Sequence, residues 1–145
     1  MLYYIAYHYS IQVLKKLIGT IIFDTVRGSN MKSDKKFNCT IEASMCFIGG
    51  KYKPIILWHL IDGEKRFSEL QRLIPQATAH TLTLQLRELE EDQLIHREVY
   101  PIVPPKTEYS LTELGKTLIP LITELREWGR YYFEYTHQPN PCEQE

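Results

Sequence analysis

The chain has 145 residues, of which 43% are hydrophobic and 24% are charged. This length and composition are typical of one globular domain with its own buried core. The formal net charge of -1 excludes a surface that is basic throughout, so contact with a polyanion would depend on locally placed Lys and Arg side chains.

The three cysteines, Cys39, Cys46 and Cys142, are odd in number and widely spaced. This spacing predicts no disulfide framework and no zinc-binding CxxC pair, and it favours a reducing, cytoplasmic compartment. The five histidines are scattered, and the sequence contains no Walker A loop, no GxGxxG and no GxSxG. We therefore expect no catalytic residues, no metal site and no cofactor.

Residues 1–36 differ from the rest of the chain because they begin with the apolar, aromatic run MLYYIAYHYSIQVLKKLIGTIIF. Lys15 and Lys16 interrupt this run too early for a membrane span, and the pattern of a signal peptide is missing. Met31 is a plausible second start. We interpret the segment as an extension outside the functional domain; the alternative is an amphipathic helix that packs on a partner or on a membrane surface.

Helical patterns follow from Thr40, which is a candidate N-cap for the segment TIEASMCFIGG. The next helix is expected to begin near Pro54, and Asp62-Gly63 is expected to form the turn that follows it. RFSELQRLIP predicts a short helix that ends at Pro75, and Thr78 is a good N-cap for the helix after it. Two helices that flank a turn of a few residues form the helix-turn-helix arrangement.

The segment TAHTLTLQLREL has two different faces. Leu82, Leu86 and Leu89 recur at the spacing of a buried stripe. The opposite face lacks the Glu and Lys of an ordinary solvated helix and offers groups that could enter the major groove of DNA. The candidates for reading bases are Thr78, His80, Thr81, Thr83, Leu84 and Arg87, of which Leu84 can contact only a thymine methyl or a sugar edge.

The pattern changes after Gln93. LIHREVYP alternates as a strand does, IVPPK is a proline-stiffened loop, and TEYSLT predicts a second strand. A hairpin directly after the second helix completes a winged helix. Basic side chains at the first motif helix and on the wing are candidate phosphate contacts, namely Lys65, Arg66, Arg97 and Lys106.

A long final helix, capped by Thr112 and bent by Pro120, is expected to close the domain. Its large apolar residues follow a heptad spacing, which suits pairing with another long helix. A subunit interface and a stripe buried within one subunit both fit this spacing. The seam consists of Leu114, Leu118, Leu121, Leu125, Trp128, Tyr132 and Tyr135, and we take Leu118, Leu121, Leu125, Trp128 and Tyr132 as the candidate dimer interface.

Three stretches, IGGKYKPIILWHLIDGEKRFSELQRLIP, LTLQLRELEEDQLIHREVYPIVPPKTEYSLTELG and LREWG, resemble the HxlR-type winged-helix transcriptional regulators of bacteria. The resemblance runs from Cys39 to about Tyr132. It implies a mainly α fold with a small β-hairpin wing, dimerising through the helices at its two ends. It also implies binding to palindromic double-stranded operator DNA as repressor or activator, with Thr78–Arg87 as recognition helix and Arg97–Thr107 as wing.

The resemblance places Lys51 and Lys53 in the family signature GGKW, with Tyr52 in place of the tryptophan, and both lysines join the phosphate candidates. Leu84 stands where the family often has glutamine, and Cys39-Thr40 replaces the usual Cys-Pro. Some relatives use that cysteine to sense oxidants or electrophiles, and a thiol at a helix N-terminus gains thiolate character. Cys39 is therefore a candidate redox sensor; the alternative is a structural or incidental cysteine.

We predict an N-terminal extension over residues 1–36, a winged-helix domain over residues 37–136 and a flexible tail over residues 137–145. The predicted function is that of a dimeric DNA-binding regulator in the cytoplasm, with a small-molecule or oxidant effector and no role at membranes. From Cys39 to Thr136, 11 basic and 14 acidic residues give a balance of -3. This balance keeps open the alternative of a protein-interaction or sensing module that does not bind DNA.

Overall fold

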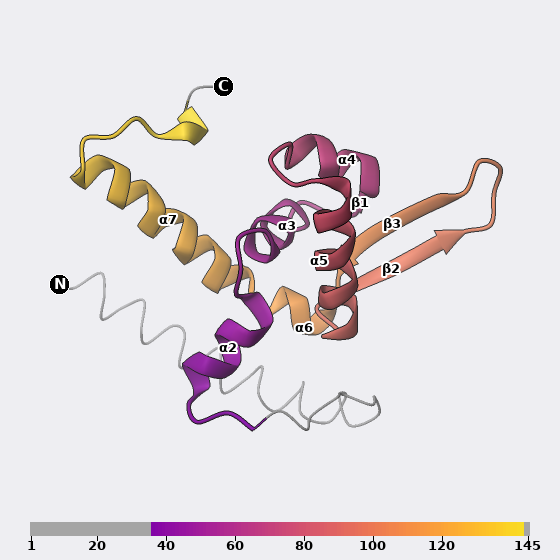
Figure 1. Cartoon of the computed structure of the whole chain (residues 1–145), viewed down its shortest axis with the longest axis horizontal. Coiled ribbons are helices and arrows are strands. Elements are labelled where there is room, and N and C mark those ends of the chain that lie inside the picture. The colour runs from indigo at the N-terminus through magenta and orange to yellow at the C-terminus, as the bar shows by residue number, and fades with distance from the viewer. Residues whose placement is uncertain (1–35, 144–145) are drawn as a thin grey trace. The chain divides into compact units, whose positions relative to one another are not determined.

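A computed structural model of the chain describes residues 36–143, and the predicted extension over residues 1–36 lies outside this range except for its last residue (Figure 1). None of the helices in the described range is long and apolar enough to cross a bilayer. The elements in chain order are α2 (Thr40–Ile48), α3 (Lys53–His59), β1 (Lys65–Arg66), α4 (Phe67–Leu73), α5 (Ala79–Glu91), β2 (Ile95–Tyr100), β3 (Lys106–Leu111), α6 (Glu113–Lys116), α7 (Ile119–Tyr135) and the 3-10 helix η1 (Pro141–Glu143).

Helices α4 and α5 form the predicted helix-turn-helix. Helix α4 ends directly before Pro75, where the backbone amide of Ile74 donates a hydrogen bond to the carbonyl of Leu70. Thr78 caps α5, because its hydroxyl accepts a hydrogen bond of 3.1 Å from the amide of Thr81. The turn between the helices is therefore short and closed by hydrogen bonds at both ends.

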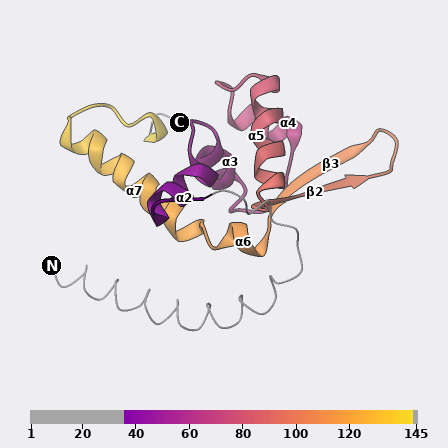
Figure 2. The ribbon, with the colours of Figure 1, turned by 60° about the horizontal axis from the view of Figure 1, so that its bottom comes forward.

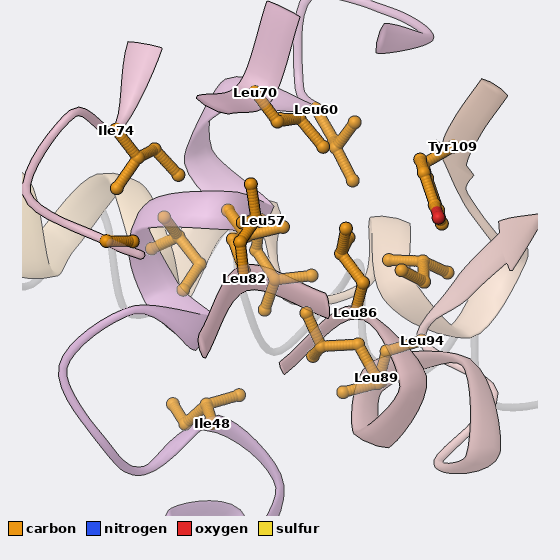
Figure 3. Close-up of a cluster of buried hydrophobic side chains, with 14 residues drawn as sticks. Ile48, Leu57, Leu60, Leu70, Ile74, Leu82, Leu86, Leu89, Leu94 and Tyr109 are labelled. Carbon is orange, nitrogen blue, oxygen red and sulfur yellow. The ribbon is translucent and has the colours of Figure 1, made fainter. Parts of the chain in front are cut away.

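The buried leucines of α5 join it to one apolar core, in which α3 contributes the facing side chains (Figure 3). Leu82, Leu86 and Leu89 are at most 2% exposed, which confirms the predicted inner stripe. Burial of each such side chain contributes roughly 1.5–3 kcal/mol. The core consists of Ile48, Ile56, Leu57, Leu60, Leu70, Ile74, Ala77, Leu82, Leu86, Leu89, Leu94, Ile95, Tyr109 and Ile122.

The wing is an antiparallel hairpin of β2 and β3, as the alternating pattern predicted. In β2 only Ile95 is buried, and the four residues after it are exposed, because the hairpin continues beyond the core (Figure 2). The structure adds a third strand that the sequence did not indicate. Strand β1 pairs with β3, with Lys65 opposite Tyr109 and Arg66 opposite Glu108.

The prediction of one continuous, bent final helix was wrong, because α6 ends at Lys116 and α7 begins at Ile119. Pro120 lies in the first turn of α7, where its missing amide leaves no helical hydrogen bond broken. Thr112 does cap α6, and its hydroxyl also donates to the carbonyl of Gln93 at 2.6 Å. After the break, α7 packs against α3.

Candidate nucleic-acid interface

The outer edge of α5 is built from side chains that the leucine stripe turns away from the core. His80, Leu84 and Arg87 are exposed, and Leu84 retains 42% of its accessible surface. None of the ion pairs among the described residues includes Arg87. Its guanidinium can therefore donate to a base edge or a phosphate without first breaking a contact.

The three threonine hydroxyls at the start of α5 already have local partners. Thr78 and Thr81 share a hydrogen bond of 2.9 Å between their hydroxyls, and the Thr83 hydroxyl donates to the carbonyl of Ala79 at 2.8 Å. A base contact from these hydroxyls would compete with such local bonds. Among the six predicted base-reading residues, His80 and Arg87 thus have the polar groups most available to DNA.

Tyr52 positions the turn that leads into α5. Its hydroxyl donates to the carbonyl of Gln76 at 2.9 Å, and its ring contacts the core. Lys51 beside it is exposed, with its ammonium 5.2 Å from the centre of the Tyr52 ring. Tyrosine thus supplies a hydroxyl donor as well as an aromatic ring at this position, and it couples the start of α3 to the turn.

Lys53 is placed differently from Lys51. It is only 6% exposed, and its Nζ lies 2.9 Å from Oε2 of Glu88 and 3.8 Å from Oδ2 of Asp92. An ammonium that is buried and paired in this way has little capacity left for a phosphate. Lys53 is therefore not expected to contact a phosphate, unlike the exposed Lys51.

Glu108 forms ion pairs with two of the predicted phosphate contacts, Lys106 and Arg66. Its Oε1 lies 2.5 Å from Nζ of Lys106 and 3.5 Å from Nε of Arg66. The hydrogen bond from Lys106 lowers the pKa of Glu108, burial opposes that effect, and Arg66 adds to it. One carboxylate thus gathers two cations and cancels part of their charge. No periodicity in the sequence marks Glu108, because Tyr109 next to it is also buried.

The remaining basic candidates lie near the same sheet. Lys65 is half-buried in β1, and Arg97 is exposed on β2, opposite Tyr109. On the same strand His96 pairs with Glu98 at 3.0 Å. Cations and carboxylates therefore alternate on the wing, and its positive charge is modest.

Cys39, and not Thr40 as predicted, is the N-cap of α2. Its Sγ accepts a hydrogen bond of 3.3 Å from the amide of Glu42. The Thr40 carbonyl instead accepts from the hydroxyl of Ser44. Cys39 and Cys142 are exposed and Cys46 is half-buried, and none of the three forms a disulfide within the described residues. The thiol of Cys39 is therefore open to reagents and lies against the amino end of a helix.

The heptad seam of α7 faces outward in the single chain. In α7 only Ile122 is buried, and it is not a seam residue. Leu121, Leu125, Trp128 and Tyr132 are all at least 40% exposed, whereas Leu118 packs against the core. The rings of Trp128 and Tyr132 stack, with their centres 5.9 Å apart. A stripe buried within one subunit does not describe this surface.

Comparison with known proteins places these features in a family. The HxlR-like helix-turn-helix family matches residues 47–137. The helix-turn-helix-type transcriptional regulator YdeP of Bacillus subtilis is 55% identical over 105 residues, which are 72% of this chain and 82% of YdeP. A regulator of the same type from Methanothermobacter thermautotrophicus is 50% identical over 116 residues, 80% of this chain and 86% of that protein.

Solved structures agree in fold. The redox regulator HypR in its oxidized form is 55% identical and has a TM-score of 0.63, covering 64% of this chain and 96% of HypR. The reduced form of the transcriptional regulator YodB from Bacillus subtilis is 33% identical with a TM-score of 0.56, covering 63% and 91%. These matches confirm the predicted winged helix-turn-helix. The chain therefore belongs to the HxlR-like helix-turn-helix family of transcriptional regulators, which are not enzymes.

Proposed function

We propose that this regulator acts as a homodimer in the cytoplasm and reads a palindromic operator through α5. The observation that carries the proposal is the exposed edge of His80, Leu84 and Arg87 on a helix whose opposite side is anchored by leucines. A helix of this width enters the major groove, where Arg pairs with the acceptor edge of guanine. Leu84 would discriminate by contact with a thymine methyl.

Phosphate contacts would fix the protein on the duplex on either side of α5. Lys51 lies directly before α3, next to Tyr52, which hydrogen-bonds to the turn before α5. Lys65, Arg66, Arg97 and Lys106 lie on the sheet that carries the wing. Such contacts set the register and carry no sequence information. Because carboxylates neutralise part of the wing, we expect moderate non-specific affinity and a large share of binding energy from the bases.

Two copies would meet through the seam of α7. Leu121, Leu125, Trp128 and Tyr132 form an apolar surface that one chain leaves open to water. Ile41 and Met45 of α2 are also exposed, at 73% and 56%. Large aromatic residues are enriched at subunit interfaces. A dimer would bury these side chains and present two recognition helices about one turn of DNA apart.

An oxidant or electrophile is the proposed effector, with Cys39 as its target. Cys39 is exposed and caps a helix, and structural relatives include HypR, described as a redox regulator, in oxidized and reduced forms. Modification of the sulfur would remove the acceptor that holds the first turn of α2. Since α2 is one of the proposed dimer helices, loosening its first turn would alter the dimer interface and with it the relative position of the two copies of α5.

The alternative function, a sensing module without DNA binding, is favoured by one observation, the acidic balance of -3 from Cys39 to Thr136. Genomic footprinting of the tagged protein, with and without diamide or an aldehyde, distinguishes the two functions. The proposal expects discrete occupied sites whose occupancy changes on treatment. A genome without protected sites under both conditions would instead support the alternative.

A further inference from the structure

Lys53 is a buried cation that joins the start of α3 to the carboxyl-terminal half of α5. Its Nζ contacts Glu88 at 2.9 Å and lies 3.8 Å from Asp92, which are one helical turn apart on α5. Asp92 is also the C-cap of α5. The ammonium thus lies near the end of the helix where a positive charge is favourable.

Stability alone does not account for a lysine at this position. Removing an ammonium from water is costly, and a well-packed apolar side chain of similar size is often as stabilising as a buried ion pair. The leucines of α5 attach the helix to the core, but apolar packing has little directional preference. An ion pair at 2.9 Å constrains direction and distance together, so it limits both sliding and rolling of α5 against α3.

The position of the pair on α5 connects this constraint to DNA reading. Glu88 directly follows Arg87, whose exposed side chain is a proposed base contact. A small roll of the helix would therefore move the guanidinium relative to the groove. The Gln85 side chain donates to Glu88 at 3.3 Å, so the carboxylate is held from its own helix as well.

We propose that Lys53 is a positioning residue for the recognition helix, which sets the orientation of α5 through Glu88 and thereby supports sequence discrimination without touching DNA. The inference rests on the proposed function of α5. It differs from a phosphate role, which would affect all DNA sequences equally and would contribute to the salt dependence of binding.

The test compares Lys53→Met and Lys51→Met with the parent protein, on an operator fragment recovered by footprinting and on a scrambled fragment. For Lys53→Met we expect the operator-to-scrambled affinity ratio to fall about tenfold, the scale of one lost base contact, with an unchanged salt slope. For Lys51→Met, the exposed control, we expect an equal loss on both fragments and a slope smaller by about 0.9. Adding Glu88→Gln to Lys53→Met should cause no further loss, because both residues act through one contact.

An unchanged operator-to-scrambled affinity ratio in Lys53→Met would overturn the inference. If the affinities for both fragments also fell equally and the salt slope became smaller, Lys53 would instead be a phosphate contact. Circular dichroism establishes whether each variant is folded. If Lys53→Met does not fold, Glu88→Gln decides the question, because Glu88 is half-exposed: a lowered ratio supports positioning, and a parental ratio excludes it. A parent protein that binds neither fragment would contradict the proposed function itself, which is a different result.

Discussion

The side chain of Arg87 illustrates how one residue can carry sequence discrimination. It lies on the exposed edge of α5, outside the ion pairs of the described residues, while its neighbours Leu86 and Glu88 are committed to the core and to Lys53. A guanidinium in this position can form two parallel hydrogen bonds to guanine, which no other residue on this edge can do. Its removal therefore tests base reading at a single point.

Replacement Arg87→Ala should weaken operator binding by about 1–3 kcal/mol and relax the preference at one base pair of each half-site. The measurement is fluorescence anisotropy on the operator and on single-base variants. Lys116→Ala is a matched control, because Lys116 is an exposed cation on α6 that is paired with Glu113 and lies outside the proposed interface. Equal operator affinity of Arg87→Ala and the parent would remove Arg87 from the proposed interface.

The Cys39→Ser variant isolates the thiol chemistry from the structural role of the cap. A serine hydroxyl is a better N-cap than a thiol, so α2 should remain folded. We expect diamide to change the operator affinity of the parent and to leave that of Cys39→Ser unaltered. Cys142→Ser, which removes the other exposed thiol, should respond as the parent does. An undiminished diamide response in Cys39→Ser would rule out Cys39 as the sensor.

Single residues were predicted from the sequence where periodicity determines their side of a helix, or where residue type favours a cap, as at Thr78 and Thr112. The stripe of Leu82, Leu86 and Leu89 follows from spacing, and so does the exposure of Arg87 opposite it. The burial of Lys53 does not, because its partner Glu88 lies 35 positions away and pairing is a tertiary property. The capping role of Cys39 was also missed, since threonine is the stronger capping type and stands next to it.

At the level of elements, the three-stranded sheet connects the wing to the helix-turn-helix. Glu108 of β3 lies opposite Arg66 of β1 and opposite Glu98 of β2. Its contacts with Lys106 and Arg66 hold the ionised carboxylate at a position that is only 8% exposed. The stability of the sheet should therefore depend on pH through this group.

The pKa of Glu108 is lowered from its ordinary value of 4.5, chiefly by the hydrogen bond from Lys106. A lowered folded-state pKa means that the ionised group stabilises the fold above pH 4.5, and that this contribution is lost as the pH falls through the folded-state value. Urea unfolding of the parent and Glu108→Gln should give a stability difference that is constant at neutral pH and shrinks on acidification below that point. A difference that does not vary with pH would contradict this ion-pair cluster.

Helices α2 to α5 and the β2–β3 hairpin were predicted from the sequence, whereas strand β1 and the break between α6 and α7 were not. Helix α5 and the β2–β3 hairpin each have enough residues to show a repeat. Strand β1 has two residues, which cannot show one, and it exists because β3 offers a free edge. The heptad spacing continues without change through the break between α6 and α7, so the spacing could not reveal that break. The local sequence feature that marks it is Pro120, in the first turn of α7.

At the scale of the whole molecule, the proposed dimer interface on α7 would link subunit association to DNA affinity. One recognition helix gives modest affinity, and two helices on a rigid dimer raise it by making the second contact intramolecular. The sequence favoured a subunit interface for this seam and left open a stripe buried within one subunit. Only the tertiary structure shows that Ile122 takes the inner position and leaves the seam open.

Leu125→Glu should convert the protein to monomers, since it places a charge in the centre of the proposed apolar interface. Because Leu125 is 46% exposed in the single chain, the subunit should remain folded. Operator affinity should fall about 100-fold through lost avidity. Sedimentation velocity and anisotropy measure the two effects. Arg130→Ala, off the seam, should leave both unchanged, and a dimeric Leu125→Glu would place the interface elsewhere.

Hydroxyl-radical footprinting of the purified protein on fragments of its own genome tests the central claim most directly. Two inward-facing recognition helices should protect an inverted pair of half-sites whose centres lie about 10–10.5 base pairs apart. Protection should be lost in Arg87→Ala at the same protein concentration. A purified protein that is monomeric and protects no fragment even at low salt would contradict the account.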